Sequence, residues 1–360
     1  MLKEIIILLI GAFVGVVFSV LFEEQLFQAK KKIRMIFTKI HRKIKPVKID
    51  YRPEAFIFAG KETSVVVIDG NGSAVIHEEN LLLKEIADPK CYPKQVFVFK
   101  EIFESDLAKP DSDFVGFNGD LWSLYSYEID RTPNDEKIKL RVALYKTDYY
   151  TFQAVTRHLR VPYFDEESKS MSSLYDKYIS TFIPSMCGGS VLPNGVGVVA
   201  NVTTSDRNVI FCKRAEQSGI RPGQWDVSVV EGLNPTRDRK MSVYDVVREA
   251  IFEEIGDLPK DKISINVLGL ILDKDYNQWN FIAVAKVGLS SEEIREIRQT
   301  GAPGKWENER MHFEQLNLRD IVRFLKSHKM WDTALLATYW TLRFREYSAA
   351  AINKEIARKI

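Results

Sequence analysis

The sequence predicts a protein of the α+β or α/β class that carries a transmembrane helix at its N-terminus. Three observations predict this architecture: an uncharged apolar run at residues 5–22, short runs rich in Val, Ile and Phe across residues 50–165, and alternating strand and helix patterns after residue 166. The chain has 360 residues, 45% of them hydrophobic, so it is long enough for two or three domains and is not a fully disordered protein.

The segment 1–22 is the predicted transmembrane helix. Its eighteen uncharged residues, IIILLIGAFVGVVFSVLF, form a helix of about 27 Å, which just spans a bilayer core. No small-x-small cleavage site follows, so we expect a retained helix rather than a cleaved signal peptide. Gly11, Gly15 and Ser19 share one face, which favours close helix packing and self-association, although glycine is common in membrane helices.

Residues 23–49 form a basic juxtamembrane segment. They hold nine basic and two acidic side chains, and apolar residues recur among them at helical spacing. This pattern predicts an amphipathic helix against anionic headgroups, with a solvated charge run as the alternative. The positive-inside rule then predicts a single-pass protein of the inner (cell) membrane with its C-terminal domains in the cytoplasm. Because the whole chain carries +2, residues 50–360 carry −5, which argues against a nucleic acid polymer as partner.

The three cysteines, Cys91, Cys187 and Cys212, are far apart in the sequence. Their odd number and their spacing fit neither a disulfide framework nor a zinc site. A reducing compartment is consistent with this usage.

Residues 50–165 predict a β-rich module. The expected strands lie at residues 56–58, 64–68, 95–100 and 137–144. The run Asp69-Gly70-Asn71-Gly72 is a turn signal of the kind that joins antiparallel strands. Whether this module packs by itself or extends the sheet of the next domain stays open.

Residues 166–346 form the second predicted domain, and residues 347–360 a C-terminal tail. The expected strands lie at 195–202, 208–213, 267–272 and 279–287, and the expected helices at 242–255, 318–326 and 333–343. Ser242 is the expected N-cap of the first helix, with Asp245 completing an approximate capping box and Gly256 at the helix end.

An acidic cluster occupies this helix, because Glu249, Glu253 and Glu254 fall within two turns. Clustered carboxylates can bind a divalent cation, which neutralises a pyrophosphate and activates water for attack. A solvated acidic face is the ordinary alternative.

The surroundings of this helix resemble the Nudix family. RPGQWDVSVVEGLNP (residues 221–235) precedes it and DYNQW (residues 275–279) follows it, and the resemblance covers roughly residues 175–345. It implies a mixed-sheet α/β/α sandwich. For an active member it also implies Mg²⁺ or Mn²⁺ held near Gly232, Glu253, Glu254 and Glu309, the last in a loop after the final strand.

The Nudix pattern is incomplete in this sequence. The family carries Arg-Glu-apolar-x-Glu-Glu-x-Gly, whereas alignment on residues 253–256 puts Glu249 at the arginine and Ala250 at the first glutamate. Glu249 and Glu254 are about 140° apart around the helix, against a family arrangement of about 100°. We therefore expect lost or altered catalysis. An active enzyme with Glu249, Glu253 and Glu254 as its catalytic set is the alternative.

A nucleotide-shaped cleft remains useful without the metal, since fold and function separate readily. The candidate phosphate contacts are Arg207, Lys213, Arg214 and Arg221, and the candidate stacking rings are Trp225, Tyr276 and Trp279. Solvated strand-end cations and core tryptophans are the alternatives.

Two further blocks, LRVALYKTDYYTFQAVTRH (residues 140–158) and EGLNPTRDRKMSVYDVVREAIFEEIGD (residues 231–257), carry a second resemblance. Together with the apolar N-terminus they resemble the SMODS-associated, Nudix-like membrane effectors of CBASS, the antiphage systems in which a CD-NTase makes a cyclic oligonucleotide. The resemblance implies that a cyclic nucleotide second messenger binds, that the protein self-associates, and that the helix disrupts the inner membrane. No cofactor is expected. The rivals are a membrane-tethered pyrophosphohydrolase that uses Mg²⁺ or Mn²⁺ on a nucleoside diphosphate derivative, and a scaffold without a small ligand.

Overall fold

The computed structural model describes residues 54–89, 92–109, 118–131, 138–180, 189–216, 221–235, 242–304 and 308–358. The predicted transmembrane helix with Gly11, Gly15 and Ser19, the basic segment 23–49, Cys91 and Cys187 all lie outside these residues. Within the described ranges, no helix is both long enough and apolar enough to cross a bilayer. Residues from Pro53 to Ile360 form one compact unit.

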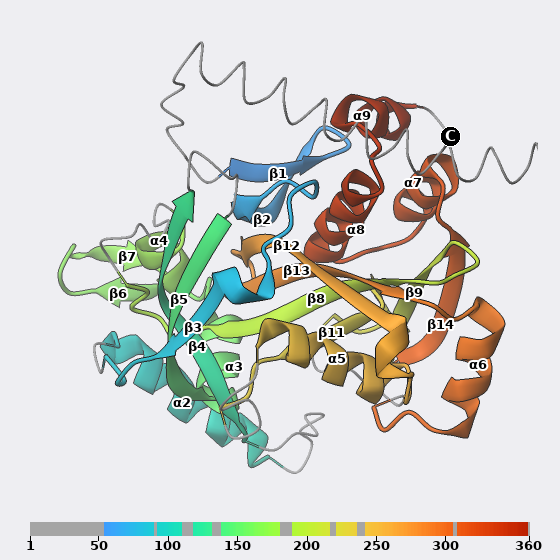
Figure 1. Cartoon of the computed structure of the whole chain (residues 1–360). Coiled ribbons are helices and arrows are strands. Elements are labelled where there is room, and N and C mark those ends of the chain that lie inside the picture. The colour runs from blue at the N-terminus through green and yellow to red at the C-terminus, as the bar shows by residue number, and fades with distance from the viewer. Residues whose placement is uncertain are drawn as a thin grey trace, which may run out of the picture. The chain divides into compact units, whose positions relative to one another are not determined.

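A nine-stranded mixed sheet is the centre of this unit (Figure 1). Its strands follow the order β1-β2-β12-β13-β8-β9-β10, while β11 pairs with β8 and β14 with β9. Strands β13 and β8 pair in parallel, and the other neighbours pair antiparallel. The bounds are β1 Glu54–Phe58, β2 Lys61–Gly70, β8 Gly195–Thr203, β9 Asn208–Arg214, β10 Trp225–Asp226, β11 Val229–Gly232, β12 Ile263–Asp273, β13 Gln278–Val287 and β14 Asn308–Gln315.

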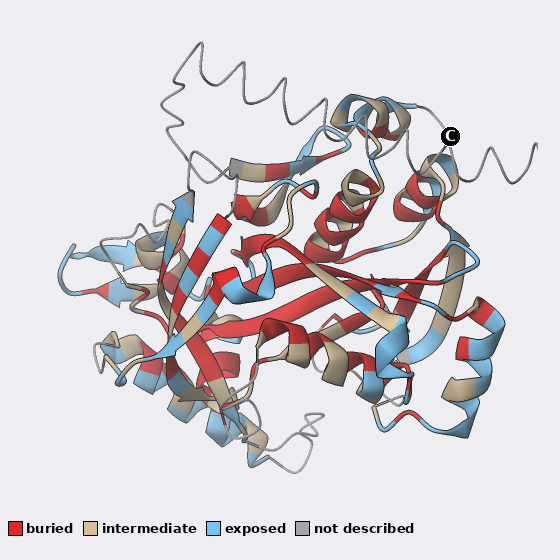
Figure 2. Cartoon of the chain, in the orientation of Figure 1, coloured by how far each residue is buried: buried red, intermediate tan, exposed pale blue. Residues whose placement is uncertain are grey.

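Helices cover both faces of the sheet. Successive residues of β13 point to opposite faces, so Phe281 packs into the core that includes α5 (Val243–Glu254), and Ile282 into the core that includes α8 (Asp332–Phe344). Helices α7 (Leu318–Ser327) and α9 (Ala349–Ala357) share the α8 face, and α9 lies within the predicted C-terminal tail. The central strands are accordingly buried (Figure 2). The predicted mixed sheet between two helical layers is confirmed.

Helix α5 begins and ends where the sequence predicts. The Ser242 hydroxyl accepts a hydrogen bond from the Asp245 N–H, and the Asp245 side chain completes the capping box. Gly256 follows the end of the helix with a φ of +136°, a conformation that favours glycine.

The remaining described strands form two smaller sheets. Strands β3 (Leu81–Glu85), β5 (Ile138–Asp148) and β4 (Asp120–Arg131) make one sheet, and β6 (Tyr163–Asp165) pairs with β7 (Ser170–Ser172). Among the described residues the other helices are α2 Lys94–Leu107, α3 Tyr149–His158, α4 Leu174–Tyr178 and α6 Ser291–Thr300, with short 3-10 helices at Glu78–Asn80 and Lys260–Lys262.

Strand β2 shows that part of the segment 50–165 extends the large sheet and does not pack by itself. Its pairing with β12 adds β1 and β2 to the nine-stranded sheet, whereas β3, β4 and β5 form a sheet of their own. The middle segment therefore contributes to two sheets of one compact unit.

The strand expected at residues 95–100 is wrong, because these residues belong to α2. Val96, Phe99 and Phe103 recur at helical spacing and are buried, whereas Phe97 and Val98 between them are exposed. A short apolar run does not distinguish strand from helix by itself, and packing against α3 decides here.

The turn signal at Asp69 to Gly72 does not join a pair of strands, which corrects the prediction. Asp69 and Gly70 still pair with β12 as part of β2. Gly70 and Gly72 have φ values of +118° and +74°, and a Cβ on either would lie under 3 Å from Trp340 of α8. These glycines let α8 approach the sheet closely.

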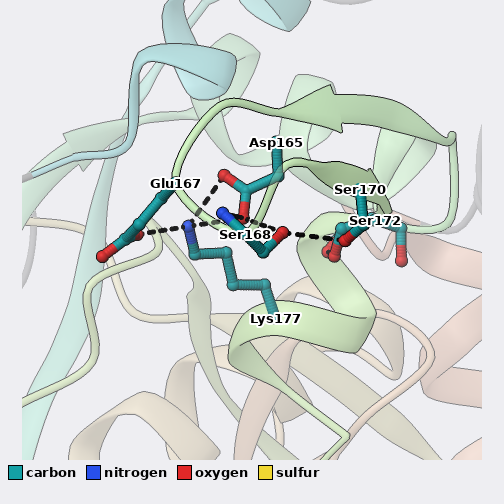
Figure 3. A network of polar contacts seen from close by, with 7 residues as sticks. Asp165, Glu167, Ser168, Ser170, Ser172 and Lys177 are labelled. Carbon is teal, nitrogen blue, oxygen red and sulfur yellow. Dashed lines mark hydrogen bonds and ion pairs between the residues drawn. The ribbon is translucent and has the colours of Figure 1, made fainter.

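The β6–β7 hairpin is fixed to α4 by a polar network (Figure 3). Lys177 of α4 donates to both carboxylate oxygens of Asp165, at 3.0 and 3.1 Å, and to Glu167 at 2.8 Å. The Ser168 hydroxyl donates to Asp165 at 2.8 Å. Because Lys177 bridges Asp165 and Glu167, the network holds the β6–β7 turn to α4 and has a structural role.

Candidate functional site

The acidic end of α5 is the first part of the candidate site. Glu254 is 8% exposed, and its Oε1 atom accepts a hydrogen bond of 2.8 Å from the backbone N–H of Val230 in β11. Glu249 and Glu253 are half-buried. Ala250, which stands where the Nudix pattern has its first glutamate, is fully buried in the apolar core. The three glutamates of this helix therefore differ in burial, and Glu254 is the one that faces the sheet.

A cationic side chain lies at the C-terminal end of α5. Arg298 of α6 donates from Nη1 to the backbone carbonyl of Glu254. The Gly304 N–H donates to the carbonyl of Glu253 at 2.7 Å, so the segment after α6 also contacts this end. A guanidinium is favourable there because the carbonyl end of a helix carries partial negative charge.

Three of the four residues that the resemblance implies as metal ligands have protein partners in this structure. Glu309 lies in β14, not in the expected loop, and it pairs with Lys213 at 3.0 Å. Gly232 is paired with Gly197 in the sheet, and Glu254 is engaged by β11. Within the described ranges, no group of three or more His, Cys, Asp or Glu side chains is placed to hold a metal ion.

The predicted phosphate contacts are not brought together. Arg207 is exposed in the turn after β8. The opposite end of β8 pairs with the start of β13, next to Tyr276 and Trp279, so about 26 Å of strand separates Arg207 from these rings. Lys213 and Arg214 end β9 as predicted, and Lys213 bridges Glu216 and Glu309 at 3.4 and 3.0 Å.

Arg221 and Tyr276 do lie together, in a buried cluster. The Arg221 guanidinium lies 3.4 Å from the ring centre of Trp331 and 5.8 Å from that of Tyr276. Its Nη1 atom is 3.1 Å from Asp226 Oδ2, and both side chains are at most 5% exposed. Burial lowers the pKa of Arg221, and the charge of Asp226 opposes that shift. The ion pair joins the loop before β10 to β10 itself, and the contact with Trp331 joins this loop to the start of α8.

The predicted stacking tryptophans lie in the core. Trp279 is 1% exposed and its ring centre is 5.8 Å from that of Tyr127. Trp225 is 8% exposed and packs edge-on against Phe324 at 5.2 Å. These placements favour the packing role that the sequence left open for both residues.

A pocket that the sequence reasoning missed adjoins the end of α5. It opens between α6 and β14 and is lined by Arg295, Arg298, Gln299, Met311 and Phe313. The available signals were the capping box of α6 at Ser290 and Glu293 and the spacing of the two arginines.

Comparison with known proteins adds the following. No protein-family model matches the chain, and no curated protein matches it. Among solved structures it is similar to DR0079 from Deinococcus radiodurans, with 14% identity over 43% of this chain and 92% of that one and a TM-score of 0.30. It is also similar to a MutT protein from Methanosarcina mazei Go1, with 14% identity, 43% and 94% coverage and a TM-score of 0.29. The Nudix hydrolase RenU from M. smegmatis has 12% identity, 42% and 84% coverage and a TM-score of 0.28. At these TM-scores the likeness supports no conclusion about the activity of this chain.

Proposed function

We propose that this chain is a membrane-anchored nucleotide sensor of the CBASS type. Its Nudix-like domain binds a cyclic nucleotide second messenger in the cytoplasm without hydrolysing it, and its N-terminal helix then disrupts the inner membrane. One observation carries the non-hydrolytic part of the proposal: Arg298, a protein cation, contacts the end of α5, while Glu254 bonds to β11 and Ala250 is apolar.

The chemistry of that helix end favours binding over hydrolysis. A nucleotide hydrolase of this kind needs a cation that both holds the phosphates and lowers the pKa of a bound water. A guanidinium binds phosphate oxygens through charge-assisted hydrogen bonds but does not activate water in that way. The arrangement supports recognition of an anionic ligand and leaves it intact.

The sensor needs only a modest difference in affinity between two states. A ligand that favours one state by about 3 kcal/mol shifts the equilibrium about a hundredfold. Two or three charge-assisted contacts to phosphate supply a difference of this size.

Binding by the full-length protein tests the proposal. The purified chain in lipid nanodiscs is titrated with the 3′,3′-cyclic dinucleotides of adenosine, guanosine and uridine, and the bound nucleotide is recovered and analysed by mass spectrometry. We expect saturable binding of at least one compound and recovery of that compound unchanged. Absence of binding across the panel contradicts the proposal.

The pyrophosphohydrolase hypothesis is tested with the same preparation. Incubation with Mg²⁺ or Mn²⁺ and ADP-ribose is expected to release no AMP. Turnover that disappears in both Glu253→Gln and Glu254→Gln would overturn the sensor proposal, because it would assign these carboxylates a role in hydrolysis.

The membrane step is tested separately by dye release. Full-length protein is reconstituted into vesicles loaded with carboxyfluorescein, and the nucleotide that binds is added outside. We expect release that depends on the nucleotide and is reduced in Gly11→Leu with Gly15→Leu, since larger side chains keep helices apart. Release without nucleotide, or none with it, contradicts this step.

A further inference from the structure

The pocket between α6 and β14 has the composition of an anion-binding site. It is an open surface depression with a volume of about 450 Å³. Its lining contains two arginines, one amide side chain and two apolar side chains, and no carboxylate. It lies beside the end of α5, which Arg298 contacts directly.

Helix α6 provides the polar wall. Arg295, Arg298 and Gln299 are spaced three and four residues apart, so they project from one side of the helix. Reciprocal hydrogen bonds between Ser290 and Glu293 fix the start of α6, and the contact of Arg298 with the Glu254 carbonyl holds its last turn against α5. The two guanidinium groups are thus presented from a helix restrained at both ends.

Strand β14 provides the apolar wall. Met311 and Phe313 alternate along the strand, face the same side and pack against the α5 core. The guanidinium of Arg295 lies 4.4 Å from the ring centre of Phe313, which orients this arginine before any ligand arrives.

The existing partner of Arg295 is easily displaced. Its ion pair with Glu292 measures 3.2 Å, and the two side chains are 49% and 73% exposed. Exposed pairs of this kind contribute little free energy. A phosphodiester carries one negative charge, as a carboxylate does, and its oxygens match the planar fork of a guanidinium, so a ligand that also contacts Arg298 replaces Glu292 at Arg295.

We infer that this pocket is where the nucleotide is held, with Arg295 and Arg298 on phosphate, Phe313 behind Arg295, and the apolar part of the nucleotide against Met311. The inference rests on the proposed function and adds the location and the chemistry of recognition. It moves the site away from the cations and rings that the sequence suggested and onto α6 and β14.

Variants of Arg295 test the assignment in the full-length protein. Arg295→Ala is compared with Arg323→Ala, a matched control on α7, which packs on the opposite face of the sheet. Arg323 is 58% exposed and forms an i,i+3 ion pair with Asp320 at 2.8 Å, just as Arg295 does with Glu292. Binding of each compound in the cyclic dinucleotide panel is measured by isothermal titration.

We expect Arg295→Ala to weaken binding about tenfold or more, since a charge-assisted contact is lost. Arg323→Ala should stay within about twofold of the wild type. Phe313→Leu should weaken binding by a smaller factor, because it keeps an apolar wall but removes the ring that orients Arg295. If the wild type binds a nucleotide and Arg295→Ala binds it equally well, the pocket assignment is overturned and the proposed function stands. If the wild type binds no member of the panel, the proposed function fails as well.

A second measurement keeps the inference testable if Arg295→Ala does not fold. Hydrogen exchange of the wild-type protein, with and without the bound nucleotide, should show protection in residues 291–300 and 308–315. Protection confined to other segments overturns the assignment.

Discussion

Glu254 offers the sharpest distinction between a structural carboxylate and a metal ligand. Its Oε1 atom accepts from the Val230 N–H at 2.8 Å in a site that is 8% exposed. Glu254→Ala leaves that N–H without its acceptor, which costs about 1–3 kcal/mol. Glu254→Gln keeps an oxygen at the same place, so we expect a loss of under about 1 kcal/mol.

The assay is thermal unfolding of the full-length protein in detergent. At roughly 2 °C per kcal/mol for a domain of this size, Glu254→Ala should lower Tm by about 2–6 °C and Glu254→Gln by less than about 2 °C. Glu296→Ala, an exposed position on α6, is the control and should change stability by no more than about 0.5 kcal/mol. An unchanged Tm in Glu254→Ala refutes the hydrogen-bond role.

Magnesium provides the second arm of the same experiment. If Glu254 were a metal ligand, MgCl₂ would raise the Tm of the wild type and not that of Glu254→Gln, because a ligand that binds only the folded state stabilises it. We expect Mg²⁺ to affect both proteins equally. A magnesium-dependent rise confined to the wild type refutes the reasoning.

Three further predictions follow from single contacts. Burial raises the pKa of Asp148, but hydrogen bonds, including those from Thr151, outweigh it and hold the pKa below its usual value. The ionised Asp148 therefore stabilises the folded protein fully above about pH 4, and this stabilisation is lost as pH falls. Tm measured from about pH 5 to pH 3 should accordingly fall less in Asp148→Asn than in the wild type. Burial raises the pKa of the Cys212 thiol, so iodoacetamide at pH 8 should label it only after unfolding, and labelling of the native protein, mapped by mass spectrometry, contradicts this. A Cβ at Gly269 would lie 2.1 Å from the Asp69 carbonyl oxygen, so Gly269→Ala should destabilise by about 2 kcal/mol or more, and a wild-type urea midpoint would count against that packing.

The parts of the fold with strong local patterns were predictable from the sequence. The run that forms β8 is buried along its whole length, and its predominantly apolar sequence made it recognisable as a central strand. The limits of α5 were recognisable because Ser242 and Gly256 determine them through their own backbone and side-chain chemistry. Such signals lie within a few residues and need no knowledge of the tertiary structure.

The candidate site depended on contacts between distant segments, so the sequence was less informative there. Helix α6 was missed because Ile294 is the one apolar side chain it buries, and Glu309 was expected in a loop although pairing with β9 places it in a strand. A tryptophan that stacks on a ligand and a tryptophan in the core look the same in the sequence. The neighbouring strands β12 and β8 bury Trp279. Residues 95–100 show the same limit, since contact with α3 decides that they are helical.

The pairing of β2 with β12 has a practical consequence for anyone who shortens this chain. Val66 lies opposite Leu272, and Val65 opposite Asp273, so β1 and β2 shield the flank of a strand that belongs to the last two hundred residues. A fragment starting at residue 166 would expose the edge of β12, whose unpaired N–H and C=O groups could then pair with the same edge of another copy. A truncated protein that does not associate through β12 must therefore start before residue 54.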